Sequence, residues 1–285
     1  MPDLKRRSAL AAVGSLAFAD TAMQRSIMSP LSYHRRVLAK HPVAYWRVEE
    51  KIGPSAHDST GHGHSGTYYG GITFGQAGAV HSEADVAIGL NGVGAYVEIP
   101  DSTAFSQPTS GRGLTVEAWL RPDTLTFQGQ TSEHYVHWLG KGQRGAFEWG
   151  FRFYSKDSPR PNRISAYIWN PTSANGGQNE GAGAYFEDEL VSGEWMHIVA
   201  CYDPGDASNP AAGVSIYKNG TLRGSPATSP GALYASYNIY PQHGVAPVRL
   251  GTRDLASFLD GGLDEVAIYP RVLTAEEILD NYTAA

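Results

Sequence analysis

Three consecutive acids, Glu187, Asp188 and Glu189, form a dense carboxylate group in this 285-residue sequence. Glycoside hydrolysis uses two carboxyl groups that flank the scissile bond. On a strand only alternate side chains share a face, so neighbouring acids point in opposite directions. Glu117 is a single acid that shares its strand face with Trp119. The sequence also lacks the motifs of serine hydrolases and of phosphate-binding loops. We therefore expect a protein that is not an enzyme, with a glycan-degrading enzyme as the weakest alternative.

Aromatic and amide side chains around a long polar segment, residues 170–188, favour ligand binding over catalysis. Long loops carry binding residues disproportionately often. An aromatic ring offers an apolar plate for a sugar, and side-chain amides can hydrogen-bond its hydroxyl groups. We predict a sugar-binding surface here, and the alternative is a flexible surface loop. The candidate ligand-binding residues are Trp169, Asn175, Gln178, Asn179 and Tyr185.

Histidines gather in two places, and imidazole is a common zinc ligand. His57, His62 and His64 share a loop with two glycines, which make it too loose for a preorganised metal site. We expect a solvated loop there, and the same for His134 and His137.

Charge is distributed unevenly along the chain, whose net charge is −6. Residues 1–40 hold seven basic and two acidic residues, a balance of +5, so residues 41–285 carry −11. Such an acidic body repels nucleic acid. The 41% of hydrophobic residues supply a full core, and 33 glycines and 17 prolines without a repeat indicate many turns.

The first 32 residues read as a separate segment, and residues 33–285 as one domain. Lys5, Arg6 and Arg7 precede an uncharged stretch, residues 8–19, that is shaped like a secretory signal and too short to span a bilayer. The alternative is a retained basic arm. A signal predicts an extracellular protein, whereas an arm predicts a packing partner. The sequence leaves both open, and it contains no transmembrane segment.

Short alternating runs separated by turn residues dominate the domain. Residues 148–154 place Trp149, Phe151 and Phe153 on one face, and residues 163–169 place Tyr167 and Trp169 together on one face. Residues 195–202 are apolar on both faces, which indicates a central strand that contains a buried His197 and a buried Cys201. Helical patterns occur at residues 33–40 and 274–282, the second with a capping box. This spacing predicts an all-β, antiparallel two-sheet sandwich with short N- and C-terminal helical segments.

Several segments, taken in order, resemble the laminin-G-like jelly roll of the concanavalin A-like lectin and glucanase superfamily. They are Pro42-Val-Ala-Tyr-Trp-Arg47, Asp58-Ser-Thr-Gly61, Leu90-Asn-Gly-Val-Gly-Ala-Tyr-Val-Glu-Ile-Pro100, Leu114-Thr-Val-Glu-Ala-Trp-Leu-Arg-Pro122, Gly193-Glu-Trp-Met-His-Ile-Val199, Ile216-Tyr-Lys-Asn-Gly220 and Leu259-Asp-Gly-Gly-Leu-Asp-Glu-Val-Ala-Ile-Tyr269. The likeness covers roughly residues 36–283 and implies a concanavalin A-like jelly roll. The first part of the domain, from the short helical pattern through Pro42-Val-Ala-Tyr-Trp-Arg47 to Phe74-Gly-Gln-Ala-Gly-Ala79, also looks like modules of tailed-phage structural proteins and of secreted bacterial proteins.

The resemblance implies a calcium site as well, because relatives often hold calcium where an N-terminal turn meets the last strand. Asp58 and Asp264 stand at the matching positions, and the ion there would be structural. Asp260 is a less certain third ligand. The alternative is that Asp58 caps its own turn and Asp264 bonds nearby backbone.

Together these patterns predict a non-catalytic recognition or attachment module, glycan-binding, at a cell or virion surface. Its expected partner is a glycan or a surface protein, and the jelly roll is not expected to bind nucleic acid. The alternative is a phage virion protein, a tail or capsid decoration that uses the jelly roll as an assembly surface. In that case the N-terminal arm would contact other virion subunits.

Overall fold

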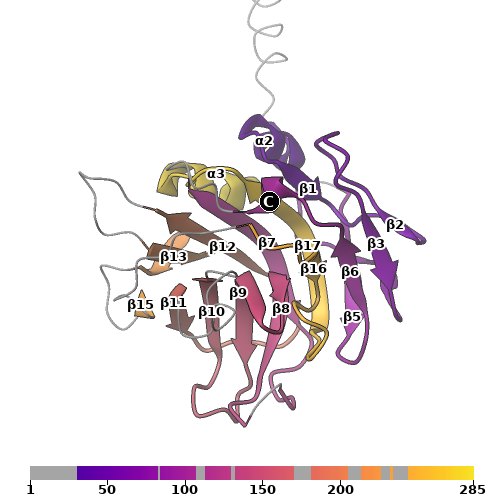
Figure 1. Cartoon of the computed structure of the whole chain (residues 1–285). Helices are drawn as coiled ribbons and strands as arrows, with labels where there is room; N and C mark the ends of the chain where they lie inside the picture. The colour runs from indigo at the N-terminus through magenta and orange to yellow at the C-terminus, as the bar shows by residue number, and fades with distance from the viewer. Residues whose placement is uncertain are drawn as a thin grey trace, which may run out of the picture. The chain divides into compact units, whose positions relative to one another are not determined.

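The computed structural model describes residues 31–82, 84–106, 113–129, 132–169, 181–204, 213–225, 232–233 and 243–285. The chain divides into two compact units, Met1–Ser32 and Tyr33–Ala285. The signal or arm predicted for the first unit lies outside the described residues, apart from Leu31 and Ser32. All elements named below belong to the second unit, drawn in colour in Figure 1.

Two antiparallel sheets form the unit, as the sequence predicts. Within the described residues the first sheet has eight strands, in the order β14-β13-β12-β7-β17-β5-β4, and β1 pairs with β17 beside that path. Their bounds are β1 Ala44–Trp46, β4 Thr73–Ala77, β5 Val86–Asn91, β7 Leu114–Pro122, β12 Met196–Asp203, β13 Gly213–Lys218, β14 Thr221–Gly224 and β17 Asp260–Tyr269.

The second sheet has nine strands among the described residues, in the order β15-β11-β10-β9-β8-β16-β6-β3-β2. Their bounds are β2 Ser55–Ala56, β3 Gly66–Tyr69, β6 Tyr96–Ile99, β8 Tyr135–Gln143, β9 Ala146–Tyr154, β10 Arg163–Trp169, β11 Gly181–Glu187, β15 Ala232–Leu233 and β16 Val248–Leu250. A short 3-10 helix, Thr103–Phe105, follows β6.

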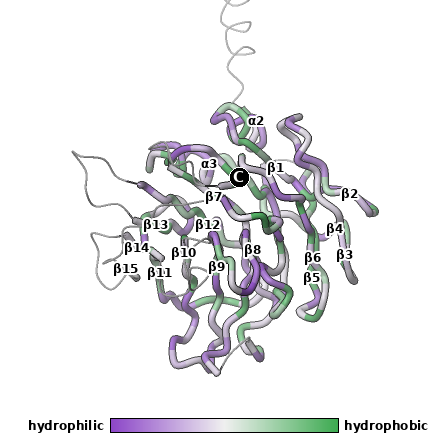
Figure 2. Tube along the Cα trace, in the orientation of Figure 1, coloured by the Kyte–Doolittle hydropathy of each residue, from purple (hydrophilic) through white to green (hydrophobic). Residues whose placement is uncertain are grey.

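The main core lies between the sheets and follows from the two-residue period of the strands. Trp149, Phe151 and Phe153 of β9 point into it, and so do alternate residues of β7, β10 and β12. Figure 2 shows hydrophobic and hydrophilic positions interspersed along these strands instead of gathered in one block. The predictions of which residues share a face in β9 and β10 are confirmed.

Two helices cover the outer face of the eight-stranded sheet, and Figure 1 shows them next to each other. They are α2, Tyr33–Ala39, and α3, Ala275–Ala284. Apolar residues of both helices pack on Trp119, Val199 and Cys201, so β12 is covered on both sides as predicted. The predicted capping box of α3 is present, because Thr274 and Glu277 each bond the other's backbone N–H group. Among the residues that the structure describes, no helix is both long and apolar enough to cross a membrane.

The segment predicted as one long loop, residues 170–188, is in part a strand. Gly181–Glu187 forms β11 and pairs with the whole length of β10. The prediction was wrong there because two glycines, Gly181 and Gly183, lower the apparent strand propensity. The structure gives these glycines a packing role, described below. Asn175, Gln178 and Asn179 lie outside the described residues.

Candidate functional site

The outer face of the nine-stranded sheet carries both described members of the predicted sugar-binding set. Trp169 ends β10 with 3% of its surface exposed, and Tyr185 lies on β11 with 9% exposed. Trp169 pairs with Gly181, whereas Tyr185 pairs with Ser165. The two aromatic residues therefore share a face but stand four strand positions apart, about 13 Å. Their assignment to a ligand stays a prediction.

Two aromatic rings stack on this face. The rings of Tyr167 and Trp169 lie 5.1 Å apart, centroid to centroid, at an interplanar angle of 15°. Opposite them stand Gly183 and Gly181, and a Cβ added at Gly181 would come within 2.7 Å of the Trp169 ring. At Gly183 the added Cβ would lie 2.8 Å from the Tyr167 ring. Because real Cβ atoms do not approach so closely, glycine on β11 is what allows the rings to lie over that strand.

Arg152 of β9 reinforces this aromatic layer. Its guanidinium carbon lies 4.4 Å from the centroid of Tyr135 and 4.6 Å from that of Tyr167. Its Nε donates to Nε2 of His137 at 3.1 Å. Burial first, and then the charges of Arg253 and Arg152, hold the pKa of His137 well below its usual value, so this imidazole is neutral. His137 is buried in β8, and the prediction of a solvated loop there was wrong.

Arg253 crosses the same face from the loop after β16. Its guanidinium carbon lies 3.9 Å from the centroid of Phe147 and 5.2 Å from that of Trp169. Its aliphatic stem passes over Gly140 and Gly150, where an added Cβ would come within 2.9 and 3.1 Å of the arginine. Two paired glycines on β8 and β9 therefore provide the space for this side chain.

The loop that carries Arg253 is fixed to the sheet by hydrogen bonds. The backbone N–H of His137 donates to Oγ of Ser257 at 3.0 Å. Oγ1 of Thr252 donates to the carbonyl of Ser257 at 2.6 Å and accepts from the N–H of Leu255 at 3.2 Å. Leu255 has a φ of 60°, a conformation that few branched residues adopt. Local bonds thus hold the arginine in place. Sequence reasoning missed Arg152 and Arg253, and the facing glycines were the available signal.

The same face continues onto β3 and β6 with a more exposed aromatic pair. Tyr69 and Tyr96 stack with centroids 4.9 Å apart at 13°, and Phe258 lies 6.2 Å from Tyr96. Tyr69 is 41% exposed, which is unusual for a large ring. Between the two aromatic groups Arg249 of β16 pairs with Glu98 at 2.8 Å and donates to the carbonyl of Arg253 at 2.7 Å. A polar bridge therefore joins the two groups.

A pocket of about 340 Å³ opens at one end of the sandwich. It is lined by the turn at residues 91–93, the loop at residues 124–128, and Phe258–Asp260. Burial, followed by the nearby charge of Asp123, raises the pKa of Asp260. Phe258 belongs to both this pocket and the exposed aromatic pair, so the pocket adjoins the outer face of the nine-stranded sheet.

Asp58, one of the two predicted metal ligands, is engaged by its own loop. Its Oδ1 accepts from the N–H of Tyr45 and from the N–H and hydroxyl of Thr60, at 3.2, 3.0 and 2.7 Å. Its Oδ2 accepts from the N–H of His64 at 3.0 Å. This arrangement corresponds to the alternative considered for Asp58, a residue that caps its own turn.

Asp264, the other predicted ligand, lies in a cluster of acids. Ligand oxygens of Glu49, Asp85 and Glu265 lie within 4.8 Å of one another. Burial, and next the charge of Asp85, raise the pKa of Asp264 well above its usual value. Burial likewise raises the pKa of Glu265. We call Glu49, Asp85, Asp264 and Glu265 the acid cluster.

One cation already touches the acid cluster. Arg47 lies 2.7 Å from Glu49 and 3.1 Å from Glu265. Three carboxyl groups, those of Glu49, Asp85 and Glu265, thus share one guanidinium. Within the described residues, Oδ1 of Asp85 and Oδ1 of Asp264 are buried without a hydrogen-bond partner. Oxygen donors of this kind fit a calcium ion. Glu49 and Asp85 escaped sequence reasoning because they lie in separate loops.

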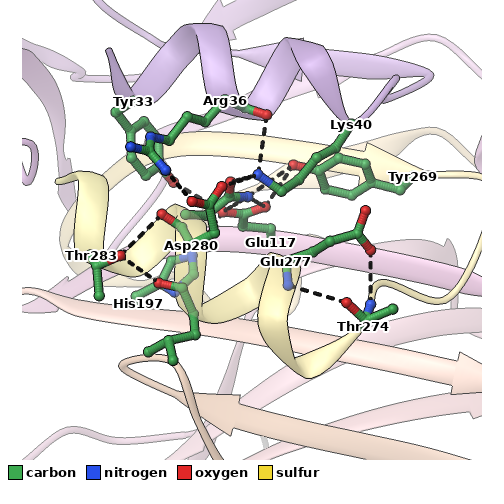
Figure 3. A network of polar contacts seen from close by, with 12 residues as sticks. Tyr33, Arg36, Lys40, Glu117, His197, Tyr269, Thr274, Glu277, Asp280 and Thr283 are labelled. Carbon is green, nitrogen blue, oxygen red and sulfur yellow. Dashed lines mark hydrogen bonds and ion pairs between the residues drawn. The ribbon is translucent and has the colours of Figure 1, made fainter. Parts of the chain in front are cut away.

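Glu117 is held in a structural network (Figure 3). Its carboxylate is fully buried and accepts hydrogen bonds from Tyr33 of α2, Tyr269 of β17, Asn281 of α3 and, in the tautomer with a proton on Nε2, His197 of β12. Burial would raise the pKa of Glu117, but these bonds, with His197 first, hold it below its usual value. His197 is buried as predicted, and Glu117 is a structural residue that joins both helices to the sheet.

Solved structures with the same architecture include receptor-binding and carbohydrate-binding domains. The botulinum neurotoxin serotype G binding domain superposes with a TM-score of 0.54 at 16% identity, over 85% of this chain and 51% of that one. The serotype D ligand-binding domain, solved with N-acetylneuraminic acid, gives 0.55 at 11%, over 87% and 52%. Domain 4 of an extracellular arabinanase from Geobacillus stearothermophilus, solved with arabinotriose, gives 0.51 at 19%, over 85% and 98%.

At these identities the likeness establishes the fold. The chain covers about half the length of the toxin domains and, in aligned extent, nearly all of the arabinanase domain. No curated protein sequence matches this chain. Residues 91–279, about two thirds of the sequence, match the family described as the concanavalin A-like lectin/glucanases superfamily. The chain therefore belongs to the laminin-G-like branch of this superfamily.

Proposed function

We propose that the chain is a non-catalytic glycan-recognition module that binds its ligand on the outer face of the nine-stranded sheet. The observation that carries the proposal is the stacked pair Tyr167 and Trp169, for which β11 supplies glycines at the facing positions. A flat aromatic surface beside polar groups suits the alternating apolar and hydroxylated faces of a sugar. The exposed pair Tyr69 and Tyr96 extends the surface toward solvent.

Two structural neighbours support this choice of ligand class, because they were solved with arabinotriose and with N-acetylneuraminic acid. The same face gives little support to hydrolysis. Its acids with described contacts, such as Glu98 and Glu187, each lie in an ion pair with a basic residue. A hydrolase needs one acid free to donate a proton and another free to act as base or nucleophile. The module acts, in this proposal, at an extracellular surface.

The test is binding of the full chain to a glycan array, followed by calorimetric titration of the glycans that bind. Trp169→Ala removes the buried platform, and Tyr69→Ala removes an exposed ring whose loss does not threaten folding. We expect each to weaken binding, Trp169→Ala by about tenfold or more, since a ring contact contributes about 1–3 kcal/mol. Leu279→Ala, an exposed apolar residue on α3, is the control. No binding to any glycan, or equal binding by all three folded variants, would overturn the proposal.

We also propose that the acid cluster holds a structural calcium ion. The buried oxygens of Asp85 and Asp264 without hydrogen-bond partners support it, as does the excess of four carboxyl groups over one guanidinium. The ion would neutralise this excess and join the loops of Glu49 and Asp85 to β17. Asp260, the less certain ligand, lines the pocket beside Phe258 and is not a member of the acid cluster.

Calcium should raise the melting temperature relative to excess chelator. At a hundredfold excess over Kd the gain is about 2.7 kcal/mol, or about 5–10 °C for a domain of this size. Asp85→Asn should abolish the response, and Asp58→Asn should retain it. A melting temperature that calcium leaves unchanged would refute the site, and a response lost only in Asp58→Asn would refute this set of ligands.

A further inference from the structure

The outer face of the nine-stranded sheet holds more positive than negative charge at its centre. Arg253 is 1% exposed, and its Nη2 donates to Asp254 at 2.9 Å. Arg152 has no carboxylate among its described contacts, which are His137 and the tyrosines around it. One buried and one partly buried guanidinium group are therefore balanced by one carboxylate, in a chain whose overall charge is negative.

Several donors on this face have nothing to bond. In the described part of the chain, Nε and Nη1 of Arg253 and Oγ of Ser165 are buried without a hydrogen-bond partner. Ser165 pairs with Arg152 across β9 and β10. Leaving a buried donor unmatched is costly, and more so for a charged group. Such a set indicates that an acceptor from outside the protein completes the site.

Because the unmatched donors belong mainly to a guanidinium group, they indicate which chemical class of acceptor fits the site. A guanidinium forms its strongest hydrogen bonds with the oxygens of carboxylates, phosphates and similar anions. Hydroxyl oxygens of a neutral sugar could accept from Arg253, but they would not balance the positive charge of the partly buried Arg152. The pKa of Arg253, which burial lowers to about 10, still leaves the side chain charged at neutral pH.

A partly exposed ring covers the arginine. Phe147, the ring that lies over the guanidinium of Arg253, is itself only half-buried, so the guanidinium lies directly beneath a surface side chain. Trp169 flanks it at 5.2 Å. A sugar that stacks near Trp169 therefore lies beside the unmatched donors.

We infer that the ligand of this face is an acidic glycan, whose carboxylate or sulfate group is bound by Arg253 with Arg152 supplying the second positive charge. This inference rests on the proposed glycan recognition and adds the class of sugar. Arg253 acts as the anion-binding residue, and the Tyr167–Trp169 stack supports the ring that carries the anion.

The experiment uses the full chain and matched pairs of glycans on one array. Oligosaccharides that contain uronic or sialic acids are paired with their methyl esters, and sulfated ones with their desulfated forms. We expect binding of one acidic class and about 10- to 100-fold weaker binding of its neutral partner, the range for a lost charge-assisted hydrogen bond. The ester and desulfation arms distinguish a carboxylate from a sulfate.

Arg253→Lys keeps the charge and removes the guanidinium donors. It should therefore weaken binding of the acidic glycan by a similar factor and leave binding of its ester nearly unchanged. Arg152→Lys is a second variant, in case the first fails to fold. Arg271→Lys, whose guanidinium pairs with Glu277 beside α3, is the matched control and should bind like wild type. Melting curves of each variant establish that it is folded.

The outcomes separate this inference from the proposed function. If no glycan binds, both fail. If neutral glycans bind as well as their acidic partners, or if Arg253→Lys weakens acid and ester equally in a folded protein, glycan recognition stands and acidic specificity is refuted.

Discussion

Replacing Glu117 by Gln should destabilise the domain strongly, although the two side chains have nearly the same shape. The carboxylate receives bonds from Tyr33 at 3.0 Å, Tyr269 at 2.7 Å and His197 at 2.8 Å, and Asn281 Nδ2 reaches both oxygens, at 3.0 and 2.9 Å. A glutamine keeps one acceptor oxygen and turns an NH₂ group toward the remaining donors. Each buried donor left unmatched costs about 1–3 kcal/mol. With two donors affected, we expect a loss of about 2–6 kcal/mol.

The pH dependence gives an independent check. Because the pKa of Glu117 is lower in the folded than in the unfolded protein, its contribution is fully present above the unfolded value, about 4.3. The contribution disappears as pH falls through the folded pKa. The stability difference between wild type and Glu117→Gln should therefore be constant near neutral pH and shrink in acid.

Urea denaturation followed by circular dichroism measures both effects. Glu194→Gln, which changes an exposed acid before β12, is the control and should stay within about 0.5 kcal/mol of wild type. A Glu117→Gln variant that also falls within this margin would show that the network does not hold the helices to the sheet. A difference that grows as pH falls would refute the assignment of a charged Glu117.

Three further changes test other parts of the structure. Gly181→Ala places a Cβ 2.6 Å from the carbonyl oxygen of Ile168, so it should cost about 1–3 kcal/mol in urea denaturation and weaken glycan binding, whereas Gly94→Ala meets open space and should do neither. Thr274→Ala removes the cap of α3 and should lower the free energy of unfolding by about 1 kcal/mol; an unchanged midpoint would contradict the cap. Burial raises the pKa of Cys201 to about 11, so the thiol should react with a thiol reagent only after unfolding, and fast labelling of the native protein would contradict its burial.

Strand periodicity was sufficient to predict the two-sheet architecture and which residues share a face in β9 and β10, because each depends on neighbours two positions apart. Strand β11 could not be recognised in this way. Its glycines reduce the local strand signal, and they are needed because a side chain at either position would clash with the aromatic rings of β10. Arg253 lies about a hundred positions from Arg152 in sequence, so only the folded sheet brings them to one face. Glu49 and Asp85 were missed for the same reason, since they belong to segments that meet Asp264 only in the folded protein.

The ion pairs between α2 and α3 determine on which side of this unit further chain can be attached. Arg36 and Lys40 of α2 both pair with Asp280 of α3, so the first and last elements of Tyr33–Ala285 are tied together on the helical side of the sandwich. Chain that leaves either end starts on the side opposite Trp169 and Tyr69. A tether, fusion partner or surface linkage at one end, or at both, therefore joins this unit on the face away from Trp169 and Tyr69.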